Sequence, residues 1–186
     1  MNSKLQIISG AYRGRKLRLP PDARPTQNRA RIALFNMLES GIVDKNAPMM
    51  VWDAFAGSGA FGLECLSRYA NAKVLFTDVA PTSLSVTRSN LATLGEGARA
   101  SVLQMDALAA IAKYGADADL VFLDPPYTDA ALGRVFVHKF GKCAKSGTIL
   151  VWEQEVANFV MPDEEKWLLL RDKTYGRARF LILQKI

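Results

Sequence analysis

The sequence predicts an α/β fold with a mostly parallel, twisted, Rossmann-like sheet and an antiparallel strand at one edge. From residue 49 onward, short apolar runs alternate with helical segments, the pattern of parallel strands joined by crossover helices. A glycine-rich turn follows the first run. The last two runs are separated by only a turn, which favours antiparallel pairing. The expected strands are 49–52, 74–76, 101–103, 120–123, 148–152, 167–170 and 179–183.

Ahead of the sheet, the sequence predicts a basic β-hairpin followed by a helix. Apolar residues alternate or cluster at 5–8 and 16–19 around a turn with two glycines, and two consecutive prolines end the hairpin. Thr26 is a possible N-cap of the helix. Helical spacing leaves Arg29 and Arg31 on the helix surface. The apolar residues expected on the inner face are Ile32, Leu34, Phe35 and Leu38.

The excess positive charge lies in this N-terminal part. The chain carries a formal net charge of +6. Residues 1–31 hold eight basic side chains against one acid, whereas the other 155 residues hold sixteen basic and seventeen acidic ones. Such an asymmetry, with arginine outnumbering lysine, is expected of an arm that docks on a polyanion. The basic side chains expected to make this contact, with RNA as the polyanion, are Arg13, Arg15, Lys16, Arg24, Arg29 and Arg31.

Length and composition favour one domain, in which residues 1–40 form the basic, polyanion-docking extension and residues 41–186 the α/β core. No stretch approaches the roughly 18 apolar residues of a membrane span. Cys65 and Cys143 lack the spacing of a disulfide framework or a zinc site. His138, the single histidine, has no partner that would give it a catalytic role. We therefore expect a cytoplasmic monomer with neither a membrane segment nor a metal.

The glycine loop leads from the first strand into a helix and predicts a nucleoside-containing ligand. The spacing Gly57-x-Gly59-x-x-Gly62 matches the dinucleotide fingerprint. Asp78 stands about twenty residues further on, as that motif requires. Asp53, just before the loop, would repel a pyrophosphate but attract a ligand that carries an ammonium and a sulfonium. S-adenosylmethionine carries both groups.

Each acidic residue near the strand ends then receives a role. Asp53 is expected to face the methionyl amine, and Gly57 and Gly59 to let the backbone approach the ligand. Asp78 would accept the ribose hydroxyls. Asp106 would accept a hydrogen bond from the adenine amine, and it also fits a helix N-cap. The full set expected to hold the cofactor is Asp53, Phe55, Ala56, Gly57, Ser58, Gly59, Asp78, Asp106 and Ala107.

The loop Asp124-Pro125-Pro126-Tyr127 follows a buried strand and predicts the catalytic site. Its two prolines make it stiff and leave it only hydrogen-bond acceptors, which suit an exocyclic NH2 group. Asp124 and the Pro125 carbonyl would orient that nitrogen for in-line attack on the methyl group, and Asp124 would accept its proton. Tyr127 would stack on a base that has left its helix.

With these motifs the chain resembles class I methyltransferases that modify amines, and more closely the RsmD family of bacterial 16S rRNA guanine-N2 methyltransferases. The resemblance covers almost the whole length. It implies methylation of one guanine N2 of small-subunit ribosomal RNA, in a cytoplasmic enzyme that acts during subunit assembly. The stretches that carry it are 9–17, 24–26, 29, 31, 34–35, 53–60, 63–64, 66–68, 124–127 and 175–176.

Three positions depart from the family pattern. Asn28 and Ile32 stand where family members usually carry acids, so any role of those acids is lost or taken over. Asp78 replaces a usual glutamate and follows what looks like a one-residue insertion.

Three other functions compete with this interpretation. A DNA adenine-N6 methyltransferase could present its base to the same loop, although no separate target-recognition domain is apparent. A nicotinamide-dependent oxidoreductase would use the glycine motif but leaves Asp53 and the proline loop unexplained. A non-catalytic RNA-binding assembly factor would not need the intact segment Asp124 to Tyr127.

Overall fold

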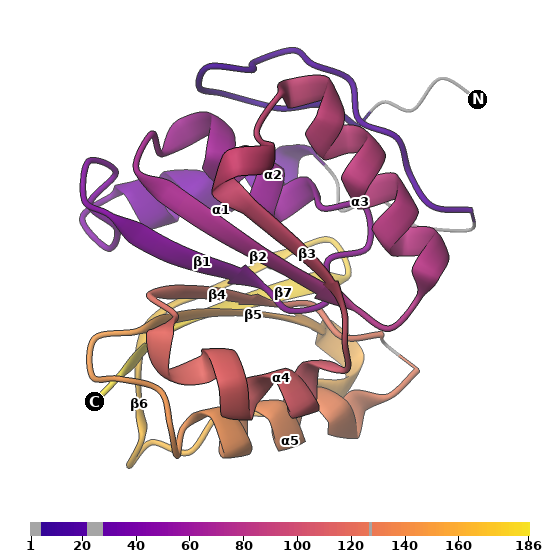
Figure 1. Ribbon diagram of the computed structural model, residues 1–186. Coiled ribbons are helices and arrows are strands. Elements are labelled where there is room, and N and C mark those ends of the chain that lie inside the picture. Colours follow the sequence, from indigo (N-terminus) through magenta and orange to yellow (C-terminus); the bar gives the residue numbers. More distant parts are fainter. Residues whose placement is uncertain (1–4, 22–27, 127) are drawn as a thin grey trace.

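The computed structural model describes residues 5–21, 28–126 and 128–186, and within them it contains the predicted sheet. Its strands are β1 (Met49–Asp53), β2 (Ala72–Asp78), β3 (Ala100–Gln104), β4 (Leu120–Leu123), β5 (Ile149–Glu155), β6 (Trp167–Tyr175) and β7 (Ala178–Lys185). They lie in the order β3-β2-β1-β4-β5-β7-β6 (Figure 1). β1 to β5 are parallel, whereas β7 pairs antiparallel with both β5 and β6. The predicted fold class is confirmed.

The strands form where the sequence has apolar runs because most of them are covered on both faces. All four residues of β4 are buried, as a central parallel strand requires. β6 lies at the edge, and it continues beyond the predicted 167–170 to Tyr175. Its second half is mostly exposed and polar, so no apolar run marked it in the sequence.

Five α-helices cover the two faces of the sheet (Figure 1). α1 (Asn28–Glu39), α2 (Ala60–Arg68) and α3 (Pro81–Leu94) lie on one face, and α4 (Ala107–Tyr114) and α5 (Ala130–Phe140) on the other. Short 3₁₀ helices span Gly97–Arg99, Gly115–Asp117 and Val156–Asn158. Among the described residues, no helix combines the length and apolar character needed to cross a membrane.

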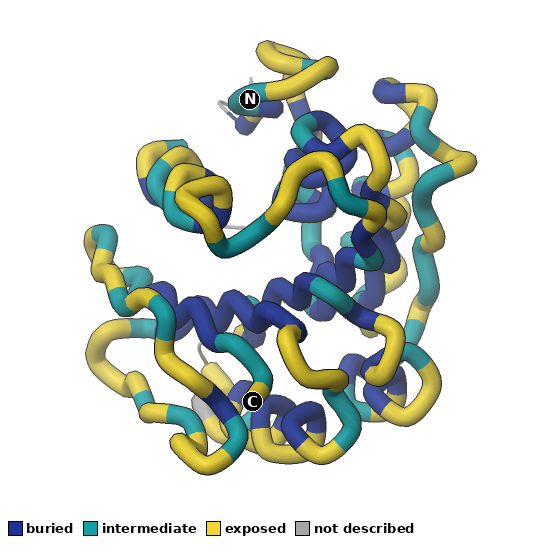
Figure 2. Tube along the Cα trace, turned by 90° about the vertical axis from the view of Figure 1, so that its left-hand side faces the viewer, coloured by how far each residue is buried: buried dark blue, intermediate teal, exposed yellow. Residues whose placement is uncertain are grey.

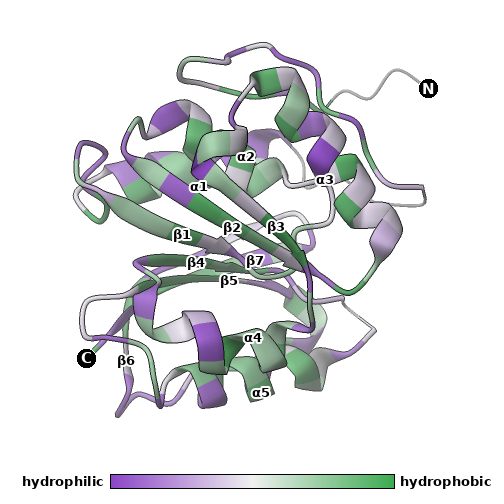
Figure 3. Cartoon of the chain, in the orientation of Figure 1, coloured by the Kyte–Doolittle hydropathy of each residue, from purple (hydrophilic) through white to green (hydrophobic). Residues whose placement is uncertain are grey.

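A separate apolar core fills each side of the sheet. Under α1 and α2, Phe61 stacks between Phe35 and Phe122, with ring centroids 5.2 and 4.3 Å away. On the other side, Trp52 packs against Phe136 of α5. The buried strands between these cores are dark in Figure 2 and green in Figure 3. This buried scaffold fixes the strand ends, where the polar side chains gather.

The N-terminal hairpin is shorter than predicted. Gln6 and Lys16 form one isolated antiparallel bridge, flanked by hydrogen bonds from Ile7 N to Arg15 O and from Leu17 N to Leu5 O, each 2.9 Å long. The ladder stops there because α2 takes up the backbone donors that follow. The donors of residues 8 and 9 bind a carboxylate of α2, and those of residues 11 and 12 bind Ser67.

Glu64 of α2 is the carboxylate that holds this segment. It is fully buried and accepts hydrogen bonds from Ile8 N (2.7 Å) and Ser9 N (2.9 Å). It also pairs with Arg31 of α1 at 3.2 Å and with Arg68 at 2.7 Å. A buried charge is tolerated only when it is paired and hydrogen-bonded in this way. One side chain therefore joins the hairpin, α1 and α2.

The expected orientation of α1 is wrong at two neighbouring positions. Ile32, expected inside, is 41% exposed, and Arg31, expected on the surface for RNA contact, is only 4% exposed. Arg31 donates to Glu64 and to the carbonyls of Gln6 and Ala60. The ion pair with Glu64 compensates the buried guanidinium, so Arg31 is a structural residue rather than an exposed contact. Arg24 and the proposed N-cap Thr26 lie outside the described residues.

Gly10 is where the hairpin touches α2 most closely. It has φ +83°, and a Cβ on it would lie 1.9 Å from the Ser67 carbonyl oxygen. Gly14, in the same turn, has the same φ, but a Cβ there would meet no atom within 4 Å. A substitution at Gly14 would therefore cause backbone strain alone, whereas one at Gly10 would cause both backbone strain and steric overlap.

Gly10→Ala is expected to destabilise the protein more than Gly14→Ala. Both changes place a side chain at positive φ, which costs about 1–2 kcal/mol. Only Gly10→Ala adds an overlap with Ser67, worth about 1–3 kcal/mol more. Urea unfolding of both variants measures the difference in stability. Equal midpoints would show that Gly10 is not in close contact with Ser67 of α2.

Candidate functional site

The predicted site residues follow strands whose carboxyl ends share one edge of the sheet. Asp53 ends β1, Asp78 ends β2, Asp106 comes two residues after β3, and Asp124 follows β4. In Figure 1 this edge lies to the right, where the arrowhead of β3 points. Ligands of open α/β sheets bind beyond these carboxyl ends.

The glycine loop between β1 and α2 has the backbone conformation that its sequence predicts. Gly57 and Gly59 have φ +54° and +77°, which other residues rarely adopt. A Cβ on Gly57 would meet no protein atom within 4 Å, so the space beside it is open. Gly62 serves packing instead, because a Cβ there would lie 2.3 Å from the Phe76 ring.

Three polar residues that the sequence analysis missed hold this loop. Ala56 N donates to the Thr77 carbonyl at 2.9 Å. From α3, Thr87 Oγ1 donates to Gly57 O at 3.0 Å and Asn90 Nδ2 to the Ser58 carbonyl at 2.9 Å. Thr87 and Asn90 are buried on the inner face of α3, where apolar residues are the rule, and this burial appears only in the structure.

Asn90 also connects the N-terminal segment to the glycine loop. Its Oδ1 accepts from Arg18 N at 2.8 Å, and its Nδ2 donates to Arg18 O at 3.0 Å. The same amide nitrogen donates to Ser58 O. The segment that precedes α1 is therefore fixed relative to the loop.

Asp53 is buried behind the glycine loop. Its Oδ2 accepts a hydrogen bond from Gly62 N at 3.0 Å. Burial raises its pKa to about 8, an effect that the Gly62 bond reduces and that the neighbouring Asp124 and Asp78 reinforce. The side chain lines the main cavity of this edge, although its first partner is α2.

Asp78 binds backbone of the glycine loop and of its own loop, and Asp106 binds backbone at the start of the helix that follows it. Asp78 Oδ2 accepts from Gly57 N and Oδ1 from Ala80 N, each at 2.9 Å. Asp106 is an N-cap, since its Oδ1 accepts from Ala109 N at 3.0 Å, and Ala107 begins α4. The N-cap interpretation of Asp106 is confirmed, and ligand contacts at these residues stay predictions.

Asp124 faces the same hollow as the glycine loop. A cavity of about 120 Å³ lies between β1, β4 and the N-terminal elements. Its lining contains Asp53, Phe55, Ala56, Gly57, Ser58 and Asp124, together with Arg31, Leu5, Leu19, Leu34 and aromatic residues. Burial raises the pKa of Asp124 to about 7. Asp78 and Asp106 lie at the same edge but are not part of this lining.

The proline loop continues from Asp124 along the edge. Pro125 is buried and Pro126 exposed, and the Pro126 carbonyl accepts from Asp129 N at 3.0 Å. Asp129 in turn caps α5 by accepting from Leu132 N. Tyr127 lies outside the described residues. Of the basic residues expected to meet RNA, Arg13, Arg15, Lys16 and Arg29 are exposed.

Comparisons with known proteins agree with this geometry. A family model described as "Conserved hypothetical protein 95" matches residues 5–184. Ribosomal RNA small subunit methyltransferase D of Escherichia coli (strain K12) is 37% identical over 99% of this chain and 91% of its own. The Haemophilus influenzae protein of the same name is 32% identical over 97% and 94%.

The structure of "Putative methyltransferase yhhF from Escherichia coli" superposes with a TM-score of 0.82 at 34% identity, over 97% of both chains. This likeness confirms the class I methyltransferase fold. The family model and the near-complete relatives together show that the chain belongs to the RsmD family.

Proposed function

We propose that this protein transfers a methyl group from S-adenosylmethionine to the exocyclic N2 of a guanine in small-subunit ribosomal RNA. The observation that carries the proposal is that Asp124 of the Asp-Pro-Pro loop lines the same cavity as Asp53 and the glycine loop. The relatives described as small-subunit rRNA methyltransferases support the substrate class. The position N2 follows from the resemblance.

The residues of the edge fit S-adenosylmethionine. Asp53 and Asp124 are two desolvated carboxyls in one cavity, and a cationic ligand offsets the cost of ionising them. Open space beside Gly57 lets a ligand lie against the backbone. The cavity is smaller than the ~300–1,000 Å³ of whole ligand sites, so only part of the cofactor occupies it. The adenosine end would extend along the edge toward Asp78 and Asp106.

Asp124 acts on the acceptor nitrogen. The bound cofactor supplies an electrophilic methyl group on its sulfonium. Hydrogen bonds from the guanine NH2 to the Asp124 carboxylate and the Pro125 carbonyl orient the nitrogen lone pair toward that methyl. A bound cofactor would supply the methyl group and leave as a neutral thioether, and Asp124 would accept the NH proton that the methylated nitrogen gives up. This role requires Asp124 to be ionised, which the positive charge of the cofactor favours.

The N-terminal part serves as the RNA-docking arm. Residues 1–40 dock the polyanion and residues 41–186 carry out transfer, within one domain. Arg13, Arg15, Lys16 and Arg29 present exposed cations, while Glu64 and Asn90 fix the segment relative to the cofactor loop. We place this activity in the cytoplasm, in a monomer that meets the assembling small subunit.

Asp124→Asn is expected to lower methyl transfer by about 10²–10⁴-fold, the usual worth of a positioned acid or base. RNA binding should persist because the shape of the loop is kept, whereas the cationic cofactor loses one attractive carboxylate and should bind more weakly. The assay is transfer of labelled methyl to naked rRNA and to small-subunit particles, followed by nuclease digestion. N2-methylguanosine is the expected product.

Asp129→Asn is the matched control. It makes the same chemical change five residues away, at an N-cap where asparagine serves as well as aspartate. Its activity should equal that of the original protein. Formation of N6-methyladenosine, or labelling of DNA alone, would contradict the proposed substrate while leaving the cofactor intact.

The ligand-free protein is expected to lose stability as the pH rises from about 4 to about 8. Asp53 and Asp124 have folded-state pKa values of about 8 and about 7, raised above their ordinary value of 3.8, so the folded state holds more protons in this window. Urea midpoints between pH 5.5 and 8.5 measure the slope. Asp124→Asn should flatten it, and an unchanged slope would mean that Asp124 is not desolvated.

Salt should weaken RNA binding steeply, and removing arm cations should reduce that dependence. Each phosphate contact contributes roughly 0.7–0.9 to the slope of log affinity against log salt. Replacing Arg13, Arg15 and Lys16 with glutamine is therefore expected to lower the slope by about two. The measurement is fluorescence anisotropy of labelled rRNA across a salt series.

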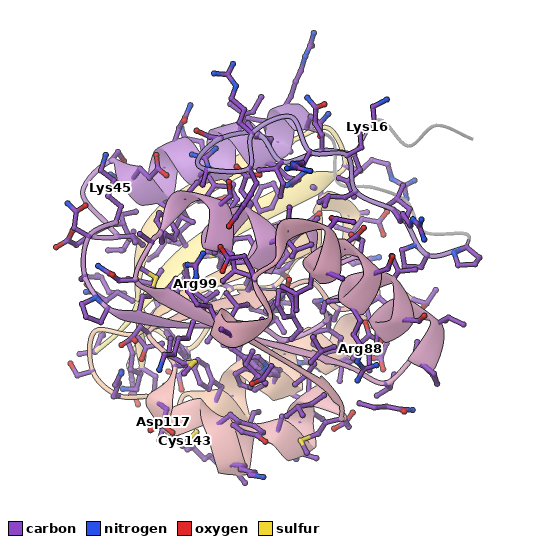
Figure 4. All side chains as sticks on the ribbon, turned by 45° about the horizontal axis from the view of Figure 1, so that its top comes forward. Lys16, Lys45, Arg88, Arg99, Asp117 and Cys143 are labelled. Atoms are coloured by element: carbon purple, nitrogen blue, oxygen red, sulfur yellow. The ribbon has the colours of Figure 1, made fainter. Side chains whose placement is uncertain are left out.

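Lys45, Lys73 and Lys113, changed together to glutamine, remove the same charge elsewhere on the surface. Figure 4 shows Lys45 and Lys16 far apart in the view. This control should keep the original slope. Equal slopes for both triple variants would contradict a docking role for the arm.

A further inference from the structure

The connection from β5 to β6 exposes three large apolar side chains. Val156, Phe159 and Met161 are 38%, 40% and 44% exposed. Asn158 of this connection lines a small hollow together with Pro125 and Pro126. Of the three, Phe159 is the aromatic one, and it directly follows Asn158.

Phe159 is held firmly despite its exposure. The backbone of the next residue is clamped by Gln154, whose Nε2 donates to Val160 O at 2.9 Å and whose Oε1 accepts from Val160 N at 2.8 Å. Gln154 is itself buried. A side chain of β5 therefore fixes the backbone next to Phe159.

The ring of Phe159 is also supported from one side. The guanidinium carbon of Arg179 lies 3.6 Å from the ring centroid. Asp172 fixes the plane of that guanidinium through two hydrogen bonds, from Nε at 2.8 Å and from Nη2 at 2.6 Å. An aromatic ring is thus backed by an oriented cation, while much of its surface stays open to solvent.

We propose that Phe159 is a stacking platform for the unpaired RNA base next to the methylated guanine, an inference that rests on the proposed function. When a base leaves its stack, its neighbour loses one stacking partner. Proteins hold such unstacked bases on aromatic rings reinforced by arginine. Asn158, the residue before Phe159, lines a hollow together with Pro125 and Pro126, the loop where the flipped guanine would enter.

Phe159→Leu and Phe159→Trp test the platform together. Stacking on one base is worth about 1–3 kcal/mol, so Phe159→Leu should raise the Kd for single-stranded RNA and the KM for rRNA by roughly 5- to 150-fold. Phe159→Trp keeps an aromatic face and should bind like the original protein. The affinity for S-adenosylmethionine and kcat should not change in either variant.

Leu168→Ala is the control for loss of an exposed apolar side chain, since Leu168 is 51% exposed on β6. It should leave RNA binding unchanged. Arg179→Gln should weaken binding less than Phe159→Leu, and the double variant should bind no worse than Phe159→Leu, because Arg179 acts through the ring.

Three results would overturn the proposal. These are unchanged RNA binding in Phe159→Leu, equal losses in the leucine and tryptophan variants, and a loss seen with assembled particles but not with naked RNA, which would indicate a protein partner. Fluorescence anisotropy of labelled single-stranded RNA measures the affinity for RNA directly, so it tests the stacking role of Phe159 independently of catalysis. Failure of the original protein to methylate any rRNA would instead contradict the proposed function.

Discussion

The buried carboxylate of Glu64 is the interaction on which the arrangement of the N-terminal half depends. It accepts two backbone donors from the hairpin and pairs with arginines of α1 and α2. Removing it would leave two amides without their acceptor and would take the buried counter-ion from Arg31, a change that costs several kcal/mol for buried ion pairs. Because α2 begins at the glycine loop, the same carboxylate links the N-terminal segment to that loop.

A second connection runs through α3. Asn90 holds the backbone of Arg18 on one side and the carbonyl of Ser58 on the other. The N-terminal segment is thus fixed at both ends, to α2 by Glu64 and to α3 by Asn90. If this segment is the RNA-docking arm that we propose, it need not order itself on binding, and the entropic cost of association is lower.

Much of the fold could be predicted because it depends on local patterns. Apolar runs located all seven strands, and the glycine spacing located a loop whose Gly57 and Gly59 have positive φ. The errors occurred where tertiary partners decide. Arg31 lies on the inner face of α1, although a charged residue is expected on the surface. Its burial is possible because Glu64, far away in the sequence, pairs with it. The loop supports Thr87 and Asn90 are likewise visible only once α3 is packed against the loop.

β7 lies between β5 and β6 in the sheet. As a result, different strands hold different parts of the edge at which the parallel strands end. The residues proposed to hold the cofactor follow β1, β2 and β3, the proline loop follows β4, and Phe159 depends on β5 and the β6–β7 pair. β6 reaches the rest of the sheet through β7. Sequence drift in the antiparallel pair can therefore reshape which RNA is recognised while the methyl-donor end stays as it is, so substrate choice and chemistry can diverge independently within such a fold.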